Sequence, residues 1–222
     1  MTQMDKRIPG FTKAVDAVAG AGQTIVSREI ILAPLAGDLT TVVNAVTPSN
    51  VALTIAAQPP QARKLNVRVV VGTTTTTAIT AGNLALVGTD QDGNAVSENI
   101  SIIQNSSATL KSVNAYAHLT SATVSGYVAS GGGTGNTIGL GPSNDFGISC
   151  GRGTVSNFAL VKATKIVTTV TGAVTAWARA VSDDVASTAV VDATARTVAP
   201  TTAPDAAGIN DYEFTVSYNL AA

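Results

Sequence analysis

Apolar and polar residues alternate along much of the chain, the pattern of strands with one buried face. The clearest case is the stretch 84–102, LALVGTDQDGNAVSENISI, in which two alternating runs flank Asp92-Gly93. Glycine adopts positive φ freely and aspartate tolerates it, so this pair suits the two-residue turn of a β-hairpin. The stretch therefore predicts two antiparallel strands joined by a tight turn.

Further segments that alternate, or that are rich in β-branched residues, predict additional strands. They cover residues 24–33, 39–46, 51–57, 65–69, 109–116, 119–128, 136–140, 158–170, 173–180 and 212–218. A glycine-rich loop is expected at 131–135 and a turn-rich segment at 142–153. Turns recur about every 8–12 residues and helical periodicity is nearly absent, so the pattern predicts an all-β fold, an antiparallel β-sandwich of jelly-roll or immunoglobulin-like type.

Residues 1–23 differ from the rest of the chain. They hold a concentration of charge that includes Lys6 and Arg7, and Pro9-Gly10 interrupts any regular structure. We expect an irregular N-terminal arm over residues 1–23, with a frayed terminus as the alternative. One β-sandwich domain is expected over residues 24–222, because no linker or internal repeat divides that part of the sequence.

Composition points to a protein that packs against other subunits. Of the 222 residues, 12% are charged, about half the ordinary 25%. Thr, Ser, Asn and Gly are abundant instead, and an uncharged polar surface costs little to desolvate at a contact. The formal net charge of -1 argues against nucleic-acid binding as a main activity.

Neither secretion nor membrane insertion is expected. The first residues lack the apolar segment of a secretory signal, and every apolar run is too short to span a bilayer. Cys150 is the only cysteine in the sequence, so no intrachain disulfide can form. We expect synthesis in the cytoplasm.

Residues capable of catalysis are scarce. A nucleophilic site would have to combine the single histidine, His118, with a residue such as Cys150, and we favour structural roles for both. Asp90, Asp92, Asn94 and Glu98 resemble a calcium loop, but their spacing fails the EF-hand pattern and a hairpin turn explains them. The sequence thus predicts no catalytic residue, no cofactor and no metal site.

Three other features have a structural and a functional interpretation. Arg63, Lys64 and Arg68 form a small basic cluster, which we interpret as the guard of an edge strand or as a subunit contact. The glycines of 131–135 match no phosphate-binding motif. Tyr127 and Trp177 are the aromatic residues that a carbohydrate-binding groove could use.

The order of several motifs resembles virion structural proteins of tailed bacteriophages. A G-T-D-x-x-G-N-A-V-S-E hairpin spans Gly88 to Glu98, a K-x-x-x-A-(Y/F) strand spans Lys111 to Tyr116, and a further motif follows the glycine-rich loop at Asn144 to Gly147. The likeness covers about residues 50–218 and leaves the arm outside. It lies in turns and strands, not in catalytic residues.

The resemblance implies a non-enzymatic component of the virion, most like a capsid decoration (cement) protein. Such proteins sit on the shell, often as trimers, and brace capsomers with an arm. The implied partners are the major capsid protein or other virion subunits and further copies of the chain, with a trimer favoured and neither nucleic acid nor membrane bound. Because an irregular arm can order on binding, we expect subunit contacts from Lys6, Arg7, Ile8, Pro9 and Phe11. The alternatives are a tail, neck or connector protein, or a carbohydrate- or receptor-binding β module.

Overall fold

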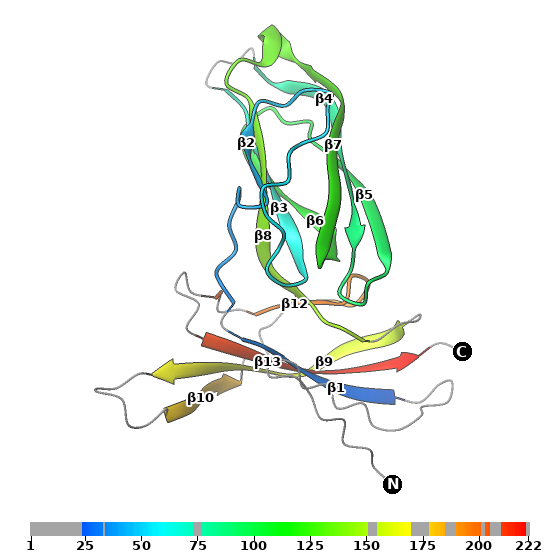
Figure 1. Ribbon diagram of the computed structural model, residues 1–222, viewed down its shortest axis with the longest axis vertical. Helices are drawn as coiled ribbons and strands as arrows, with labels where there is room; N and C mark the ends of the chain where they lie inside the picture. Colours follow the sequence, from blue (N-terminus) through cyan, green and yellow to red (C-terminus); the bar gives the residue numbers. More distant parts are fainter. Residues whose placement is uncertain are drawn as a thin grey trace. The chain divides into compact units, whose positions relative to one another are not determined.

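The computed structural model describes residues 24–32, 34–72, 77–150, 155–169, 178–184, 190–200, 203–204 and 210–220. These residues form antiparallel strands together with one short 3-10 turn, Ser130–Gly133, which confirms the predicted all-β class (Figure 1). No helix in the described part of the chain is long and apolar enough to cross a membrane. The predicted arm, residues 1–23, lies outside the described residues.

By its contacts the chain divides into two compact units. One is the continuous segment Gly37–Gly147, and the other combines the chain before and after it. The sequence predicts one domain over residues 24–222, whereas the contacts separate an inserted unit from the unit that surrounds it. Alternation identifies strands but not their partners, and the partner of the first described strand lies at the far end of the chain.

The inserted unit is a sandwich of two antiparallel sheets. One sheet contains, in order, β2 (Val43–Val46), β8 (Thr137–Gly147), β3 (Arg63–Val70) and β6 (Ala108–Tyr116). The other contains β5 (Ala95–Ser101), β4 (Ile79–Thr89) and β7 (His118–Ala129). The pairing of β3 with β6 and of β4 with β7 matches the central strands of an immunoglobulin-type sandwich. The outer strands depart from that order, because β8 lies between β2 and β3.

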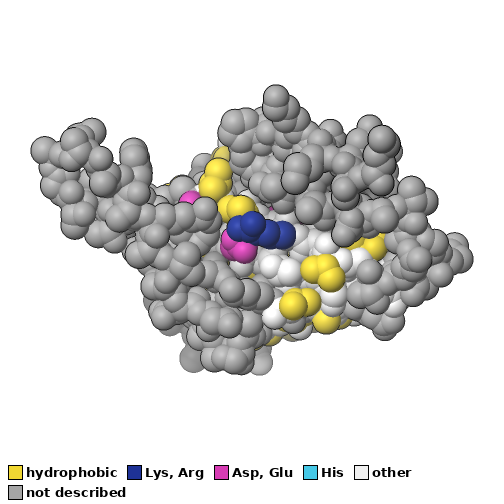
Figure 2. All heavy atoms as spheres, turned by 90° about the horizontal axis from the view of Figure 1, so that it is seen from below, with side chains coloured by type: hydrophobic (Ala, Val, Ile, Leu, Met, Phe, Trp, Pro, Cys, Tyr) yellow, Lys and Arg dark blue, Asp and Glu magenta, His cyan; other side chains and the backbone are white. Residues whose placement is uncertain are grey.

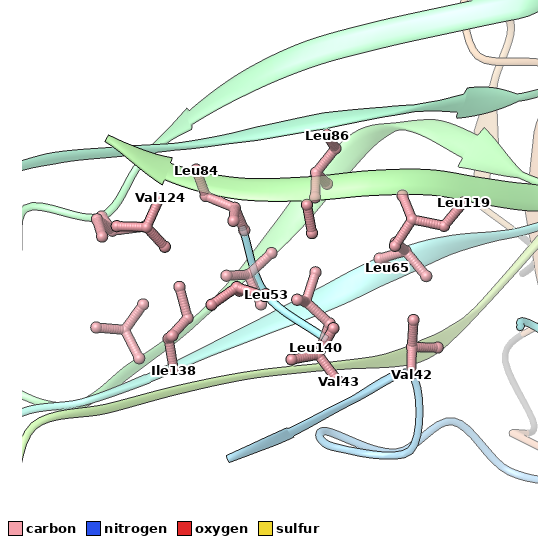
Figure 3. Close-up of a cluster of buried hydrophobic side chains, with 14 of the residues drawn as sticks. Val42, Val43, Leu53, Leu65, Leu84, Leu86, Leu119, Val124, Ile138 and Leu140 are labelled. Carbon is pink, nitrogen blue, oxygen red and sulfur yellow. The ribbon is translucent and has the colours of Figure 1, made fainter. Parts of the chain in front are cut away.

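Apolar side chains from both sheets meet between them and form the core (Figure 3). Alternate residues of β3 and β4 supply its centre, as the alternation predicted, and their side chains are at most 1% exposed: Leu65, Val67, Val69, Leu84 and Leu86. Burying a side chain of this size stabilises the fold by about 1.5–3 kcal/mol. The core therefore fixes which face of each strand points inward.

The predicted hairpin is present as β4 and β5, but its turn differs from the prediction. The Asp90 N–H donates to Asn94 O at 2.9 Å and the Gly93 N–H to Asp90 O at 3.1 Å, while Gly93 has φ 80°. This is a three-residue loop, a type I turn followed by a left-handed glycine. Asp-Gly suits both loop lengths, so the dipeptide alone did not distinguish them.

The predicted turn-rich segment after residue 142 contains the second half of a long strand, β8. In the first half of β8, Gly139 and Gly141 are needed because the segment before β2 crosses the strand closely. A Cβ at Gly141 would lie 2.0 Å from Asp38 Oδ1, and one at Gly139 would lie 2.9 Å from Thr40 Cγ2. Glycine in a strand can mark such a close approach, so these two glycines allow the neighbouring chain segment to cross β8.

The predicted strand at 51–57 is reduced to a single bridge between Ala52 and Thr123. Backbone hydrogen bonds beside that bridge hold the segment to β7: Leu53 N–H donates to Ala122 O at 2.8 Å and Val124 N–H to Val51 O at 3.0 Å. These bonds cover part of the outer edge of β7.

The surrounding unit contains a four-stranded antiparallel sheet with the order β1 (Thr24–Ile31), β13 (Asn210–Leu220), β9 (Val155–Thr169) and β10 (Ala178–Asp184). A small hairpin, β11 (Val190–Asp192) and β12 (Thr197–Ala199), belongs to the same unit. The predicted apolar face of the last strand is confirmed, since Tyr212, Phe214, Val216 and Tyr218 are all buried.

Candidate functional site

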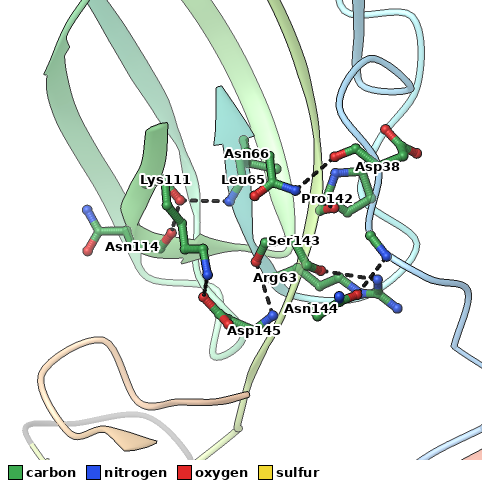
Figure 4. A network of polar contacts seen from close by, with 12 residues as sticks. Asp38, Arg63, Leu65, Asn66, Lys111, Asn114, Pro142, Ser143, Asn144 and Asp145 are labelled. Carbon is green, nitrogen blue, oxygen red and sulfur yellow. Dashed lines mark hydrogen bonds and ion pairs between the residues drawn. The ribbon is translucent and has the colours of Figure 1, made fainter. Parts of the chain in front are cut away.

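The polar side chains of the sandwich concentrate at the end where the chain enters and leaves it (Figure 4). The Gly37 N–H donates to Asn144 Oδ1 at 2.7 Å, so the entering segment is bonded to the end of β8. The Gly147 N–H donates to Ala62 O at 2.8 Å, which bonds the departing segment to the start of β3. The entry and exit points of the unit are thus held close together.

Arg63 is the centre of this region and is fully buried. Its Nη1 donates to Ser143 O at 3.2 Å, its Nη2 donates to Gln61 Oε1 at 2.9 Å, and its Cζ lies 4.5 Å from the centre of the Phe146 ring. The Nε atom has no hydrogen-bond partner among the described residues. Burial lowers the pKa of the guanidinium to about 10, against the opposing effect of the Asp38 carboxylate, so Arg63 is a cation at neutral pH.

An ion pair connects the outer strand of this sheet to β8. Lys111 Nζ on β6 lies 2.8 Å from Asp145 Oδ2, and the Asp145 N–H donates to Ser143 Oγ at 3.0 Å. We call Asp38, Arg63, Lys111, Ser143, Asn144 and Asp145 the base cluster. Its hydrogen bonds and ion pair connect β3, β6, β8 and the segment before β2, so it stabilises the end of the sandwich.

The base cluster corrects the interpretation of the basic residues on β3. This strand is not an edge strand, because β8 and β6 flank it on both sides. Arg63 and Lys64 are buried, and only Arg68 is exposed. The prediction that these residues protect an edge strand is therefore wrong. Arg63 and Lys64 lie inside the unit, where neighbouring residues cover the apolar part of each side chain.

The acidic residues of the hairpin organise its loop. Asp90 is buried, and its Oδ1 accepts the backbone N–H groups of Asp92 and Asn94, each at 2.9 Å. Asn94 Nδ2 donates to Asp90 Oδ2 at 3.2 Å. These are the contacts of a hairpin turn, as the spacing of the acidic residues predicts. Within the described ranges, no three His, Cys, Asp or Glu side chains gather as metal ligands.

Replacing Asp90 with alanine is expected to lower the free energy of unfolding by about 1–2 kcal/mol, because the Asp92 and Asn94 N–H groups lose their partly buried acceptor. Asp90→Asn keeps the Oδ1 acceptor and should lose less than half as much. Urea denaturation followed by circular dichroism measures both values. Equal losses in the two variants would show that the negative charge, not the acceptor geometry, is what matters.

Glu98 connects the two sheets of the sandwich, because it lies on β5 of one sheet and bonds to β6 of the other. From β5 its Oε2 accepts the Val113 N–H at 2.7 Å, and its Oε1 accepts the Asn114 N–H at 3.2 Å and the Tyr116 hydroxyl at 2.9 Å. The carboxylate therefore satisfies backbone donors on the free edge of β6. Sequence reasoning missed this role, because no local pattern indicates which distant strand a glutamate will reach.

Burial, and secondly the Glu98 carboxylate, raise the pKa of the Tyr116 hydroxyl far above its ordinary value of 10.0. The folded state then holds this proton more tightly than the unfolded chain does. The resulting stabilisation is fully present below about pH 10 and is lost as pH rises above that value.

We therefore expect the free energy of unfolding of the wild-type protein to fall above about pH 10, with Tyr116 contributing up to about 1.4 kcal/mol per pH unit. Tyr116→Phe should remove that share of the slope. Urea denaturation of both proteins between about pH 8 and 11 measures the difference. Parallel pH profiles would contradict a protonated Tyr116 in the folded state.

The three motifs that carry the bacteriophage resemblance meet at this end of the sandwich. Lys111 of the second motif pairs with Asp145 of the third, and Tyr116 of the second bonds to Glu98 of the first. Gly147 ends the third motif, where a Cβ would lie 2.7 Å from Gln91 Oε1 in the hairpin loop and 3.0 Å from the Ala115 Cβ. The motif residues thus contact one another and hold the fold.

The remaining candidates are dispersed. His118 is exposed at the start of β7 in the inserted unit, whereas Cys150 is buried in the surrounding unit with its Sγ 3.6 Å from Ile148 O. The Tyr127 hydroxyl accepts Asn136 Nδ2 at 3.0 Å. The predicted contact residues Lys6, Arg7, Ile8, Pro9 and Phe11, and also Trp177, lie outside the described residues.

Comparison of the chain with models of protein families, with curated proteins and with solved structures found no match.

Proposed function

We propose that the protein is a structural component of a tailed-bacteriophage particle, most like a capsid decoration protein. The observation that carries the proposal is the convergence of the three resemblance motifs on one end of the sandwich. Their polar residues are used in contacts with each other: Lys111 with Asp145, Tyr116 with Glu98, and Asp90 with Asn94. Because the resemblance lies in residues with structural roles, it supports a structural function for the chain.

The exposed residues of the sandwich also suit a packing role. The outer edge of β5 presents Ser97, Asn99 and Ser101, which are exposed and uncharged. Because these side chains carry no charge, this surface can be covered by another protein with a small desolvation cost. These features support contact with other virion subunits, among which the major capsid protein is the proposed partner.

The proposal includes self-association, for which the resemblance favours a trimer, and contacts from the N-terminal segment that contains Lys6, Arg7 and Phe11. It also assigns no enzymatic activity to the chain. A protein of this kind acts by occupying a fixed position in the particle and binding its neighbours there.

Locating the protein on purified particles tests the proposal. Particles assembled with the full chain and particles assembled without it are compared by cryo-electron microscopy and by the protein stoichiometry of the particle. We expect additional density on the capsid exterior, at a constant ratio to the major capsid protein, only when the chain is present.

Density in the tail, neck or connector would replace decoration by one of those structural roles. Absence of the chain from purified particles would overturn the proposal. In that case sugar binding by the isolated protein, lost on Trp177→Ala, would identify it as a carbohydrate-binding module.

A further inference from the structure

The sandwich has two sides along which one sheet meets the other, and the two sides are closed by different means. On one side, the segment 51–57 bonds to both sheets through its backbone: Leu53 N–H donates to Ala122 O of β7 at 2.8 Å, and Ala56 N–H donates to Val42 O, next to β2, at 2.8 Å. On the other side β5 lies beside β6, and no backbone hydrogen bond between these two strands occurs in the described part of the chain. This second side, which we call the seam, therefore depends on side chains.

A bulge in β6 directs two backbone donors across the seam. The ladder between β3 and β6 is interrupted where Leu65 alone faces residues 112–114 of β6, an irregularity of the β-bulge type. The Leu65 N–H donates to Ser112 Oγ at 2.7 Å, so a side-chain hydroxyl takes the place of a backbone carbonyl in the ladder. The next two N–H groups, those of Val113 and Asn114, point across the seam instead. Successive backbone N–H groups that converge in this way form a place for an anion.

The carboxylate of Glu98 occupies that place. Glu98 lies between Val96 and Ile100 on the inward face of β5, and an inward-pointing charge is one of the means by which natural sheets protect an edge strand. Its oxygens accept the two N–H groups of the bulge at 2.7 and 3.2 Å and the hydroxyl of the buried Tyr116 at 2.9 Å. Three donors of β6 therefore converge on one carboxylate, and hydrogen bonds to a carboxylate are stronger than those between neutral groups.

These donors are neutral, and within the described ranges no lysine or arginine forms an ion pair with Glu98. Two other carboxylates pair with cations, Asp145 with Lys111 and Glu213 with Arg28. Figure 2 shows a contact of this kind, between a basic and an acidic side chain, at the surface of the protein. At the seam, the fixed directions of the backbone donors match the two oxygens of a carboxylate. We therefore expect this place to select the shape of a carboxylate and not negative charge alone.

We propose that the bulge of β6 and the Tyr116 hydroxyl form a carboxylate-binding site, that Glu98 is its built-in ligand, and that the seam opens when this carboxylate leaves. In the intact chain, the attachment of Glu98 to β5 keeps its carboxylate at a high effective concentration beside the donors, so free carboxylates do not displace it. Removal of the Glu98 side chain turns the same donors into a site for a small free carboxylate. Neither the site nor the opening depends on the proposed place of the protein in a particle.

The seam opens before the opposite side of the sandwich because its other contacts are weak. Val96 and Ile100 of β5 are only partly buried. Asn114 Nδ2 lies 3.5 Å from Ser97 O, at the limit of a hydrogen bond. On the opposite side, opening must break the backbone hydrogen bonds of the segment 51–57. Local opening takes place where the fewest such contacts have to be broken.

Amide hydrogen exchange, measured residue by residue by NMR, tests the site in the full chain. Glu98→Ala should accelerate exchange at Val113 and Asn114 about tenfold or more, because each N–H loses a charged acceptor. A ligand as small as formate binds no more tightly than about 1 mM. Sodium formate is therefore added at about 0.3 M, with sodium chloride at the same concentration as the reference. By mass action, formate should slow the exchange of both amides in this variant about threefold or more relative to chloride.

Further comparisons isolate the carboxylate. In the wild type, formate and chloride should have the same effect, because Glu98 already fills the site. Asn99→Ala, which removes an exposed side chain beside Glu98 on β5, should leave both amides within about twofold of their wild-type rates. Glu98→Ala combined with Tyr116→Phe should respond less to formate, because one donor is missing. Equal effects of formate and chloride on Glu98→Ala would overturn the site.

Glu98→Gln keeps the site testable if the alanine variant does not fold. The amide side chain retains one acceptor and places a donor where the second oxygen was. Exchange should therefore accelerate more at one of the two N–H groups, Val113 or Asn114, than at the other. Wild-type rates at both would show that the carboxylate is not the ligand that these donors select.

The wild-type protein alone tests the opening. After correction for intrinsic rates, exchange at Val113 and Asn114 should be about tenfold or more faster than at Leu53 and Val124 on the opposite side. Urea below the unfolding transition should accelerate exchange at the seam with a slope that is smaller than at Leu53 and Val124 but greater than zero, because opening exposes part of the apolar surface. A slope of zero would mean that only the Glu98 side chain moves. A slope equal to that on the opposite side would mean that the seam opens only on complete unfolding, and either result contradicts the proposed opening.

Discussion

Replacing Arg63 with alanine is expected to lower the free energy of unfolding by about 3 kcal/mol, one of the two largest effects expected in this protein. The change leaves a cavity where a fully buried side chain lay, and it leaves the Ser143 carbonyl without its donor. It also removes the guanidinium from the face of the Phe146 ring. Urea denaturation of the wild type and the variant at neutral pH gives the difference.

Two further substitutions separate the causes of this loss. Arg63→Met restores most of the volume and removes a buried donor, Nε, that has no partner among the described residues, so it should recover more than half of the loss. Arg68→Ala on the same strand removes an exposed cation and should change stability by less than about 0.5 kcal/mol. If methionine proves as destabilising as alanine, the charge and its hydrogen bonds, not the volume, hold this end of the sandwich.

Gly88→Ala should destabilise the fold by about 3 kcal/mol, the upper part of the range for overpacking. A Cβ at Gly88 would lie 2.1 Å from the backbone oxygen of His118 and 2.9 Å from the Tyr116 Cδ1. The first of these atoms belongs to the backbone of the neighbouring strand, so the clash can be relieved only by separating β4 from β7. Thermal and urea unfolding of the variant measure the loss.

Gly126→Ala is the matched control for that substitution. Gly126 has a φ of 63° and nothing within 4 Å of its Cβ position, so alanine there meets only the conformational cost of about 1 kcal/mol. The difference between the two variants isolates the steric contribution at Gly88. Equal losses would show that β4 and β7 tolerate the added methyl group.

The strands that the sequence predicted best are those that face water on one side. Val67 and Val69 on β3 lie on either side of Arg68, and Phe214 on β13 lies between two polar residues. Leu84 and Leu86 on β4 alternate with the smaller Ala85, and the structure buries all of these large apolar side chains. The period of two in the side chains decides this outcome locally. Fold class could therefore be predicted without knowledge of any pairing.

The prediction failed where distant segments approach each other. The sequence predicts a turn-rich segment from Pro142, yet Pro142 to Gly147 belong to β8, which pairs with β2 and β3. The segment containing Asp38 crosses this strand closely at Gly141. The buried position of Arg63 depends on Phe146 and Ser143, both far away in sequence. Local patterns carry no information about such partners, and for the same reason the division into two units was not predicted.

The insertion of one unit within the other gives the chain a natural order of folding during synthesis. All strands of the sandwich have been made once Gly147 is complete, whereas β1 must wait for β13, the last strand. Once the sandwich folds, the hydrogen bond from Gly37 to Asn144 brings together the points where the two chain segments of the surrounding unit begin. The loop that β1 and β13 must then close is shorter, which reduces its entropic cost. Folding of the inserted unit thus makes it easier for β1 and β13 of the surrounding unit to pair.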